Sequence, residues 1–345
     1  MNLLFSQNMA CSHRERKMFK KIIVALFIIF TSQSAIIAQE DIIARWNSQG
    51  WKTDFSKTTI DLKEVGNIIA ADAIPSIDDP KFQLATDETE VKGNEPVVAF
   101  EYNGIARAYP LRYLMWHEIV NDVIDDLPIA VTYCPLCNSS VVFERTLGDD
   151  VVTFGTTGKL RFSGLLMYDR GEENWWQQMT GEAIVGVRAG ERLKALPSYL
   201  ISFDIYKERY PNGEILLADR RRASLSGQNP YVNYDSSEFP FLFSGEIPED
   251  IEAMMRIAFV QEPREIAVTL PYLEKNSPFR LGDLEFTWQA GQASALDSGI
   301  ISEGRDVGNI EVYQILENGE KTPVVYTVTF AFVGRAFIKD LEIIQ

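Results

Sequence analysis

One stretch, residues 131–140 with the sequence VTYCPLCNSS, limits what this chain can fold into more than any other. A run of β-branched and aromatic residues, typical of a strand, leads directly into two cysteines three positions apart, and small polar residues follow. A strand that ends in a tight turn brings the sulfurs of Cys134 and Cys137 to one point in space. We therefore expect a site at this turn.

The first 38 residues predict a secretory signal peptide. Lys20 and Lys21 precede an apolar run over residues 22–30, and the stretch that ends at Ala38 supplies the small residues of a cleavage site. An uncleaved membrane anchor is the alternative, but residues 22–38 are interrupted by polar side chains, and a span needs about 20 apolar residues. We expect a secreted or periplasmic protein with no stable membrane span after cleavage.

The charge of the chain argues against two classes of partner. The full sequence has a formal net charge of −16, and removal of residues 1–38 leaves 28 basic against 48 acidic residues, a net charge of −20. An acidic surface of this size repels nucleic acid and anionic lipid. We expect neither as a partner, and the sequence identifies no partner protein or small molecule.

Cleavage would also remove Cys11 and His13. The mature chain would then have only two cysteines, Cys134 and Cys137, and one histidine, His117, all within 21 positions. A secreted scaffold held together by disulfides spreads its cysteines over the chain. The thiols and the imidazole of this chain are instead gathered at one place, which favours a single chemical site.

The pattern of short apolar runs predicts a β-rich α+β fold with antiparallel meander or barrel-like sheets and a few short helices. Residues 96–109 form two apolar runs separated by Asn-Gly, a strong hairpin signal. From Leu111 the apolar spacing is helical, so we expect His117 on a short helix that ends at Asn121 and Asp122. Residues 128–133 then read as the strand that leads into Cys134.

We divide the chain into a signal peptide over residues 1–38, an irregular N-terminal arm over 39–95, a lobe with the cysteines and His117 over 96–240, and a second β-rich lobe over 241–345. The segment 284–294 can be aligned with 129–139, with glutamines in place of both cysteines. The second lobe is therefore a candidate degenerate repeat of the first, which gives two related lobes.

Several motifs follow one another in a specific order: Tyr109–Leu111, Trp116–Asp122, Val131–Cys137, Phe154-Gly155, Gly158, Met167–Arg170, Trp176–Gln178 and Gly181–Ala183. Together they resemble the bacterial domain of unknown function family 3179. The resemblance is strong over residues 96–245 and looser to about Phe337, and it implies an exported bacterial protein with no established activity. The family often has a second histidine near its C-terminus, whereas residues 330–337 have none, so that histidine's role has no counterpart here.

Metal binding is the leading hypothesis for this site. Two thiolates at this spacing and an imidazole from a neighbouring helix, from Cys134, Cys137 and His117, are ligands suited to copper or zinc. An asparagine after the second cysteine, Asn138, tolerates the left-handed conformation that turns backbone amides toward the sulfurs. A fourth ligand or supporting contact could come from five other side chains: Met115, Glu118, Met167, Asp169 and Arg170.

Two other hypotheses compete with a metal site. Cys-x-x-Cys also occurs in thiol–disulfide oxidoreductases. If this chain belongs to that class, a nearby His117 would lower the pKa of one of its thiols. The third is a non-catalytic interaction module in which a disulfide pins the turn. Trp176 and Gln178 are candidate pocket residues, although tryptophans at such positions more often belong to the core. No nucleotide-binding motif is present, and we expect no nucleotide cofactor.

Overall fold

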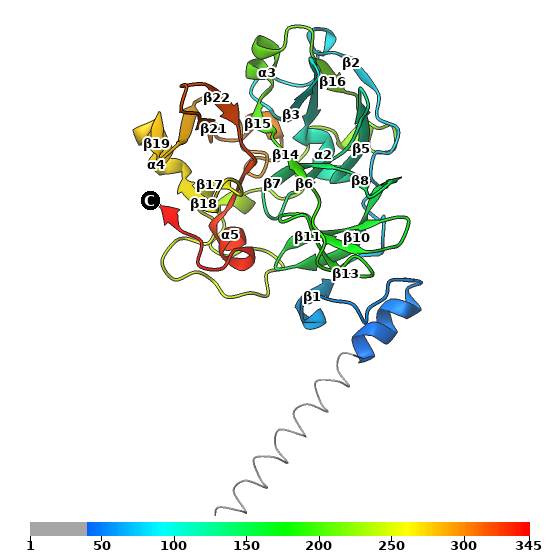
Figure 1. Ribbon diagram of the computed structural model, residues 1–345. Helices are drawn as coiled ribbons and strands as arrows, with labels where there is room; N and C mark the ends of the chain where they lie inside the picture. The colour runs from blue at the N-terminus through cyan, green and yellow to red at the C-terminus, as the bar shows by residue number, and fades with distance from the viewer. Residues whose placement is uncertain (1–39) are drawn as a thin grey trace, which may run out of the picture. The chain divides into compact units, whose positions relative to one another are not determined.

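The computed structural model describes residues 40–345, and its framework consists of short strands joined by turns, with a few short helices (Figure 1). The predicted signal peptide, with Cys11 and His13, lies outside the described residues. Residues 40–48 are helical and belong to a unit that ends at Lys52, and Thr53–Gln345 form a second, compact unit. The site predicted from the sequence belongs to this second unit.

Within the described residues the strands form five open sheets and one two-stranded ribbon. Strands are given in the order of hydrogen-bonded neighbours. The first sheet contains β1 (Val65–Asn67), β10 (Phe154–Arg161), β11 (Gly164–Asp169), β12 (Trp175–Gln177) and β13 (Glu182–Val185), and the second contains β14 (Ala195–Leu196), β7 (Ser139–Glu144), β6 (Leu127–Cys134) and β5 (Ile119–Ile124). The third sheet contains β15 (Tyr199–Ser202), β3 (Pro96–Tyr102), β4 (Ile105–Pro110), β16 (Glu214–Leu216) and β2 (Phe82–Leu84). The other two are β23 (Tyr326–Phe330), β17 (Arg256–Val260), β18 (Ile266–Thr269) and β24 (Ile343–Ile344); and β19 (Phe279–Leu281), β20 (Leu284–Gln289), β21 (Asn309–Ile315) and β22 (Lys321–Pro323). The ribbon is β8 (Thr146–Leu147) with β9 (Asp150–Val151).

Four seven-residue helices lie between these sheets in the second unit: α2 (Leu111–His117), α3 (Phe203–Arg209), α4 (Leu270–Asn276) and α5 (Ala331–Phe337). The prediction of a β-rich α+β fold with a few short helices is confirmed. The barrel-like closure is corrected, because each sheet is open and helices such as α2, which contacts both β3 and β6, separate one sheet from the next. Two strand pairs, β4 with β16 and β18 with β24, are parallel.

The predicted hairpin is present as β3 and β4, joined at Asn103 and Gly104. Both turn residues have a positive φ, 51° and 79°. This conformation costs little for glycine and for asparagine, and it matches the twist of the two strands, which is why the sequence signal is reliable.

The helix that carries His117 is shorter than predicted. It ends at His117 itself, and Glu118 adopts a left-handed conformation with φ 58° and ψ −30°. Residues Ile119–Ile124, which were expected to contain the end of the helix, form β5 and pair with β6. Their β-branched side chains suit a strand, and pairing with β6 outweighs the helical spacing of the apolar residues.

The same order of elements occurs twice in the second unit. β3, β4, α2, β5, β6 and β7 follow one another as β17, β18, α4, β19, β20 and β21 do. The outer strand beside each hairpin, β15 or β23, is followed by a seven-residue helix, and each hairpin also gains one parallel strand. Each set also contacts the other through equivalent strands, because β7 of the first set lies against β23 of the second, and β21 of the second lies against β15 of the first. The sheet from β10 to β13 has no counterpart in the second set.

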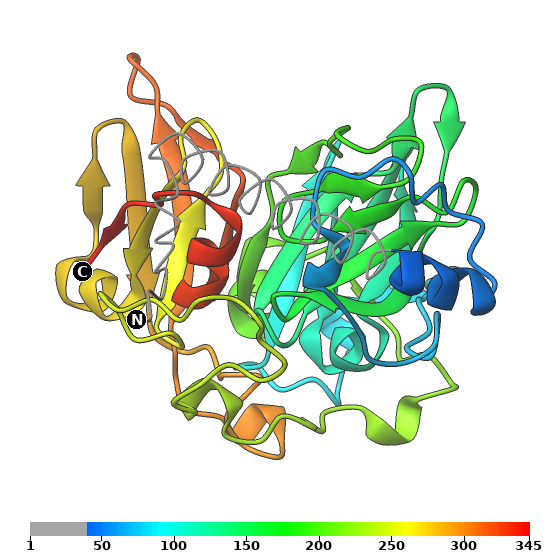
Figure 2. The same cartoon turned by 90° about the horizontal axis from the view of Figure 1, so that it is seen from below.

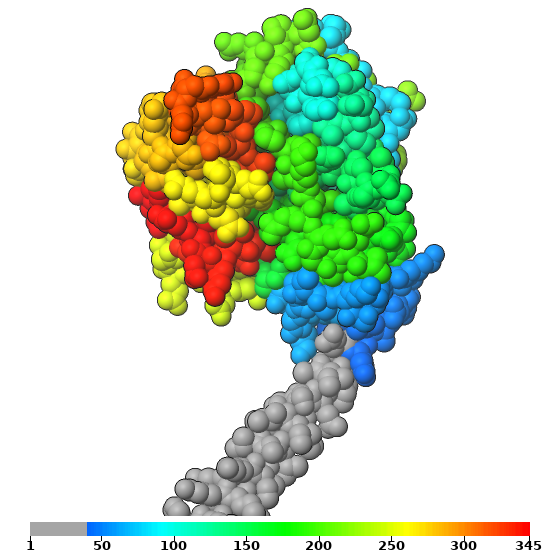
Figure 3. All heavy atoms as spheres, viewed as in Figure 1, coloured from blue at the N-terminus to red at the C-terminus, as the bar shows by residue number. Residues whose placement is uncertain are grey.

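The two sets of sheets pack against each other through their buried side chains. In Figure 2 the strands from β17 onward, yellow to red, lie beside β3 to β7, cyan to green. In Figure 3 the atoms of the second set, yellow to red, lie directly against the green atoms of the first set on the face that is drawn. One hydrophobic core includes residues of both sets, and Cys134 and Cys137 belong to it.

Candidate functional site

The two cysteines lie in a tight turn between β6 and β7. Cys134 is the last residue of β6, and the turn is closed by hydrogen bonds from the Cys137 amide to the Cys134 carbonyl, 3.2 Å, and from the Asn138 amide to the Pro135 carbonyl, 3.1 Å. Asn138 has φ 51°, the left-handed conformation predicted for it. Both thiols are free and buried, and each sulfur lies 3.7 Å from the Ser163 carbonyl oxygen.

Side chains from distant parts of the chain hold this turn in place. The Thr329 hydroxyl of β23 donates to the Cys137 carbonyl at 2.7 Å, and the Tyr234 hydroxyl donates to the Leu136 carbonyl at 2.9 Å. Gln178 accepts from Ser139 Oγ at 2.8 Å and donates to Thr132 Oγ1 at 3.0 Å. These hydrogen bonds hold the turn in one conformation, so the relative positions of the two sulfurs are fixed.

The pKa values of the two thiols are shifted in opposite directions. Burial raises the pKa of Cys134, but the Cys137 thiol and the backbone amides of Leu165, Cys137 and Leu136 donate hydrogen bonds to its sulfur, and the net pKa lies below the ordinary thiol value. Burial and the neighbouring Cys134 raise the pKa of Cys137 well above it. At neutral pH Cys134 is therefore the better nucleophile and Cys137 keeps its proton.

Glu118 brings a carboxyl group to the same place. It follows α2 directly, its amide donates to the Leu114 carbonyl at 2.8 Å, and its carbonyl accepts from the Tyr133 amide at 2.8 Å. Burial and the adjacent Cys134 raise the pKa of the Glu118 carboxyl to about 8. A left-handed conformation is uncommon for residues other than glycine and asparagine, and such strained positions cluster at functional sites.

A cavity of about 220 Å³ gives access to Cys134 and Glu118. Cys134 lines it, whereas Cys137 does not, so the more nucleophilic sulfur is the one that a molecule in the cavity meets. The walls are mostly apolar, and burial lowers the pKa of the one lysine in them, Lys159, to about 8. The rim carries four exposed apolar side chains, Ile68, Ile69, Phe241 and Leu242.

His117 lies in a different environment. Its Nδ1 is 2.7 Å from the Pro75 carbonyl oxygen, which only accepts, so Nδ1 carries the proton. The ring lines a separate, much smaller cavity with Asp219 and Arg222, and burial lowers its pKa. No hydrogen bond joins His117 to either thiol in the described part of the chain. Glu118 and Cys134 therefore line one cavity, and His117 lines another.

The remaining predicted residues have structural surroundings. Asp169 accepts from Trp176 Nε1 at 2.8 Å and from Asn174 Nδ2 at 2.9 Å. Arg170 pairs with Asp78 at 3.2 Å and donates to Ser76 Oγ at 2.7 Å. Met115, Met167 and Trp176 are buried in the hydrophobic core, and Gln178 holds the cysteine turn through Ser139 and Thr132. Of these side chains Gln178 is the one that forms hydrogen bonds to Ser139 and Thr132, which flank the cysteine turn.

Sequence reasoning missed three contributors to the site: Tyr231, Lys159 and Thr329. Tyr231 and Lys159 line the cavity, and burial and the nearby Glu118 raise the pKa of Tyr231. Thr329 belongs to β23, 192 positions from the Cys137 carbonyl that it contacts. No signal in the sequence indicated Lys159, because its strand, β10, has the polar and glycine-containing sequence FGTTGKLR, and a lysine in such a segment is usually exposed.

A family comparison identifies the chain in general terms. Residues 71–339 match a family described as a protein of unknown function, DUF3179. The chain belongs to this family. The matched region contains the cysteine turn, Glu118 and Thr329, and it ends within the last helix-to-strand connection. Neither the curated proteins nor the solved structures include a match to the chain.

Two further observations concern metals and membranes. Among residues 40–345, no group of three or more His, Cys, Asp and Glu side chains is arranged to hold a metal ion. The helices within that range are all too short or too polar to cross a membrane.

We expect replacement of Glu118 by glutamine to change how stability depends on pH. The folded-state pKa, about 8, lies above the ordinary value of 4.5, so between these values the folded protein holds a proton that the unfolded chain has released. The free energy of unfolding contributed by Glu118 therefore falls as pH rises through this window, by up to about 1.4 kcal/mol per pH unit.

Urea unfolding of wild type and Glu118→Gln at pH 5, 6, 7 and 8 measures this effect. The stability of the variant relative to wild type should rise steadily with pH, because only wild type loses the contribution. Glu249→Gln, which removes an exposed carboxylate, serves as the control and should give a constant difference. A constant difference for Glu118→Gln as well would contradict the raised pKa.

Proposed function

We propose that this protein is a thiol–disulfide oxidoreductase in which Cys134 is the nucleophile and Cys137 the resolving thiol. The observation that carries the proposal is the asymmetry of the pair: Cys134 has a lowered pKa and lines a cavity, whereas Cys137 has a raised pKa and lies behind it. Thiol–disulfide exchange requires an accessible thiolate and a second thiol that attacks afterwards.

The reaction transfers two electrons between the protein and a substrate disulfide. The Cys134 thiolate attacks one sulfur of the substrate, its disulfide breaks, and one substrate sulfur leaves as a thiolate that takes up a proton. Cys137 then loses its proton and attacks Cys134 Sγ, which releases the second substrate thiol. The protein gains a Cys134–Cys137 disulfide, and the substrate gains two thiols. The reverse sequence oxidises a substrate dithiol.

Glu118 suits the role of proton carrier in both steps. With a pKa of about 8 its carboxyl group is largely protonated at neutral pH and can give a proton to the leaving thiolate. The resulting carboxylate can then accept the proton of Cys137, whose pKa it also influences. A carboxyl with an ordinary pKa would be ionised and could not perform the first transfer.

Redox equilibration provides the test of this proposal. The folded protein is incubated in buffers with different ratios of reduced to oxidised glutathione, and free thiols are then blocked. Mass spectrometry counts the blocking groups on Cys134 and Cys137: two for the reduced pair and none for the disulfide. We expect reversible interconversion and a potential in the range from about −270 to −120 mV that oxidoreductases cover. A pair that reacts only after the protein has been unfolded would exclude the proposal.

Copper or zinc binding is the second candidate, and one observation favours it. The Nδ1 proton of His117 is donated to a backbone carbonyl, which is the usual arrangement of a histidine whose Nε2 binds a metal. Both sulfurs also face one carbonyl oxygen. The ligands would be Cys134, Cys137 and His117, and His117 would have to reach the thiols from its separate cavity. Equal, background metal content in wild type and His117→Ala after expression with added copper and zinc would exclude it.

The sequence supports two additions to this proposal. We propose export from the cytoplasm, on the basis of the signal-peptide pattern in residues 1–38, which would deliver the thiol pair to a compartment where disulfides form. We also propose that the two related lobes expected from the sequence arose by duplication, and the repeated order of strands and helices supports this idea. The second lobe has glutamines in place of the thiols, so the redox reaction would belong to the first.

A further inference from the structure

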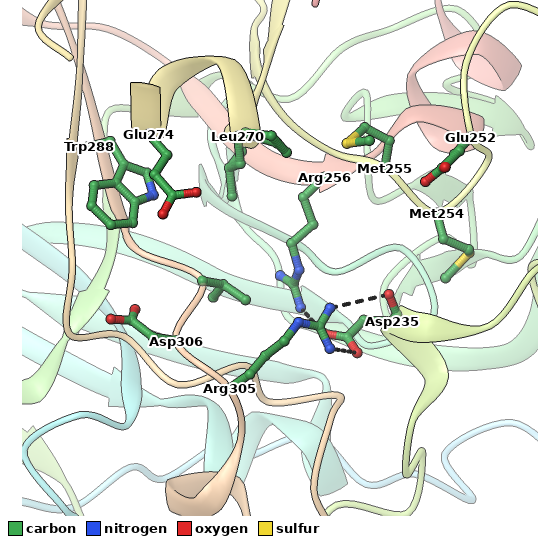
Figure 4. A pocket seen from close by; sticks show the side chains of 12 residues that line it. Asp235, Glu252, Met254, Met255, Arg256, Leu270, Glu274, Trp288, Arg305 and Asp306 are labelled. Atoms are coloured by element: carbon green, nitrogen blue, oxygen red, sulfur yellow. Dashed lines mark hydrogen bonds and ion pairs between the residues drawn. The ribbon is translucent and has the colours of Figure 1, made fainter. Parts of the chain in front are cut away.

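A second cavity, of about 300 Å³, lies between β17, α4, the end of β20 and the loop before β21 (Figure 4). None of its lining residues lines the cavity of Cys134. Met254, Met255 and Leu270 form what we call the apolar wall, and Glu252 and Glu274 form what we call the acidic mouth. A concave site with apolar walls and a few polar groups is the usual form of a small-molecule site.

Arg256 lines the cavity near the middle of the side chains drawn in Figure 4, and it is more than nine-tenths buried. Its Nη2 donates to Asp235 Oδ2 at 2.8 Å and to Ser294 Oγ at 2.7 Å. Its Nε is buried and has no hydrogen-bond partner among the described residues. Buried N–H groups nearly always have an acceptor, so this atom indicates where an oxygen of a ligand would bind.

The charges of the cavity do not cancel. Asp235 is neutralised by Arg256 and by Arg305, whose Nη1 lies 2.8 Å from Asp235 Oδ1. Asp306 accepts from the backbone amides of three loop residues. The side chains of the acidic mouth are exposed, and neither forms a hydrogen bond or ion pair within residues 40–345. Two uncompensated negative charges thus remain, on a chain whose net charge is −16, and they attract a cation.

An aromatic ring lies beside Glu274. Trp288 is half-buried near the end of β20, and Figure 4 shows it next to Glu274. Gly308, with φ 77°, lies directly against the indole, and a Cβ at that position would be 2.0 Å from Trp288 Nε1. The ring is thereby held in one orientation. The face of an indole is the best aromatic partner for an ammonium group.

We propose that this cavity binds a small organic ammonium compound that carries a carbonyl or hydroxyl oxygen close to its ammonium group. The ammonium lies between the Glu274 carboxylate and the face of Trp288. The oxygen accepts the unsatisfied hydrogen bond from Arg256 Nε, and the carbon body of the ligand contacts the apolar wall. Amino acid amides and the amino-terminal residues of peptides have this combination of groups.

Calorimetric titration with three related probes tests each part of the proposal. L-Leucinamide has the ammonium, the carbonyl and an apolar body; N-acetyl-L-leucinamide lacks the charge; isopentylamine lacks the oxygen. We expect saturable binding of leucinamide and affinities at least about tenfold lower for the other two, because each loses a charged hydrogen bond. No saturable binding of leucinamide, or equal binding of its acetylated form, would overturn the proposal.

Matched variants locate the binding. Glu274→Gln keeps the size of the side chain and removes the charge beside Trp288, so it should weaken leucinamide binding by about tenfold. Glu317→Gln, which changes an exposed carboxylate between β21 and β22, should leave it unchanged. Both positions are exposed, and equal melting temperatures will verify that the two variants fold. Equal weakening by Glu317→Gln would show a general charge effect and overturn the proposed site.

Discussion

Replacement of Cys134 by serine should abolish thiol–disulfide exchange, whereas replacement of Cys137 should stop the reaction after its first step. Cys134 lines the cavity and has the lower pKa, so the Cys137→Ser protein can still attack a substrate disulfide. The mixed disulfide then persists because no resolving thiol remains. Mass spectrometry after incubation with oxidised glutathione should find one glutathione on Cys137→Ser and none on Cys134→Ser.

The control for this experiment is His117→Ala. His117 lies in a separate cavity and makes its hydrogen bond to Pro75, so exchange at the thiols should proceed at the wild-type rate. Loss of exchange in His117→Ala would assign the imidazole a part in the reaction and contradict a mechanism that uses only the two thiols and Glu118. Equal labelling of both serine variants would contradict the asymmetry of the two thiols.

The sequence was sufficient to predict the features of the site that depend on neighbouring residues. The strand over residues 128–133, the turn with Cys134 and Cys137, and the left-handed Asn138 all occur as expected. Each of these depends on local propensities: β-branched residues for the strand and asparagine for the left-handed position. Local signals of this kind act within a few residues and need no knowledge of the fold.

The sequence could not distinguish His117 from Glu118 as the partner of the thiols. Neighbouring residues of a helix point about 100° apart, so an end that moves by one residue decides which side chain faces a given sheet. Here the helix ends at His117, and the left-handed Glu118 lines the same cavity as Cys134. His117 was the expected partner because an imidazole can bind a metal or lower the pKa of a thiol. Burial and Cys134 instead give the Glu118 carboxyl a pKa of about 8.

The sequence also could not predict which strands that are distant in the chain pair with each other. The apolar pattern predicts most of the strands, but it does not indicate that β16 joins β4 in parallel or that β23 lies against β7. Thr329 and Tyr234 fix the cysteine turn from 192 and 98 positions away. These contacts depend on how the sheets pack, which no alternation of polar and apolar residues specifies.

Replacement of Asp235 by alanine should cause one of the largest losses of stability that a single substitution can produce in this protein. The Asp235 side chain is fully buried and accepts from Arg256, Arg305 and Ser294, so it links η4 (Tyr234–Ser236) with β17 and the loop before β21. Without it the Arg256 guanidinium stays buried and uncompensated. Breaking such a pair from one side costs about 3 to 5 kcal/mol.

Urea unfolding of Asp235→Ala and of Asp79→Ala compares a buried pair with an exposed one. Asp79 and its partner Lys81 are mostly exposed, so this control should lose only about 0 to 1 kcal/mol. The double variant Asp235→Ala with Arg256→Met should recover part of the loss, because it also removes the buried charge and keeps an apolar side chain of similar length. A loss below about 1 kcal/mol for Asp235→Ala would mean that water reaches Arg256 and solvates it, and the buried Nε would then have a partner other than a ligand.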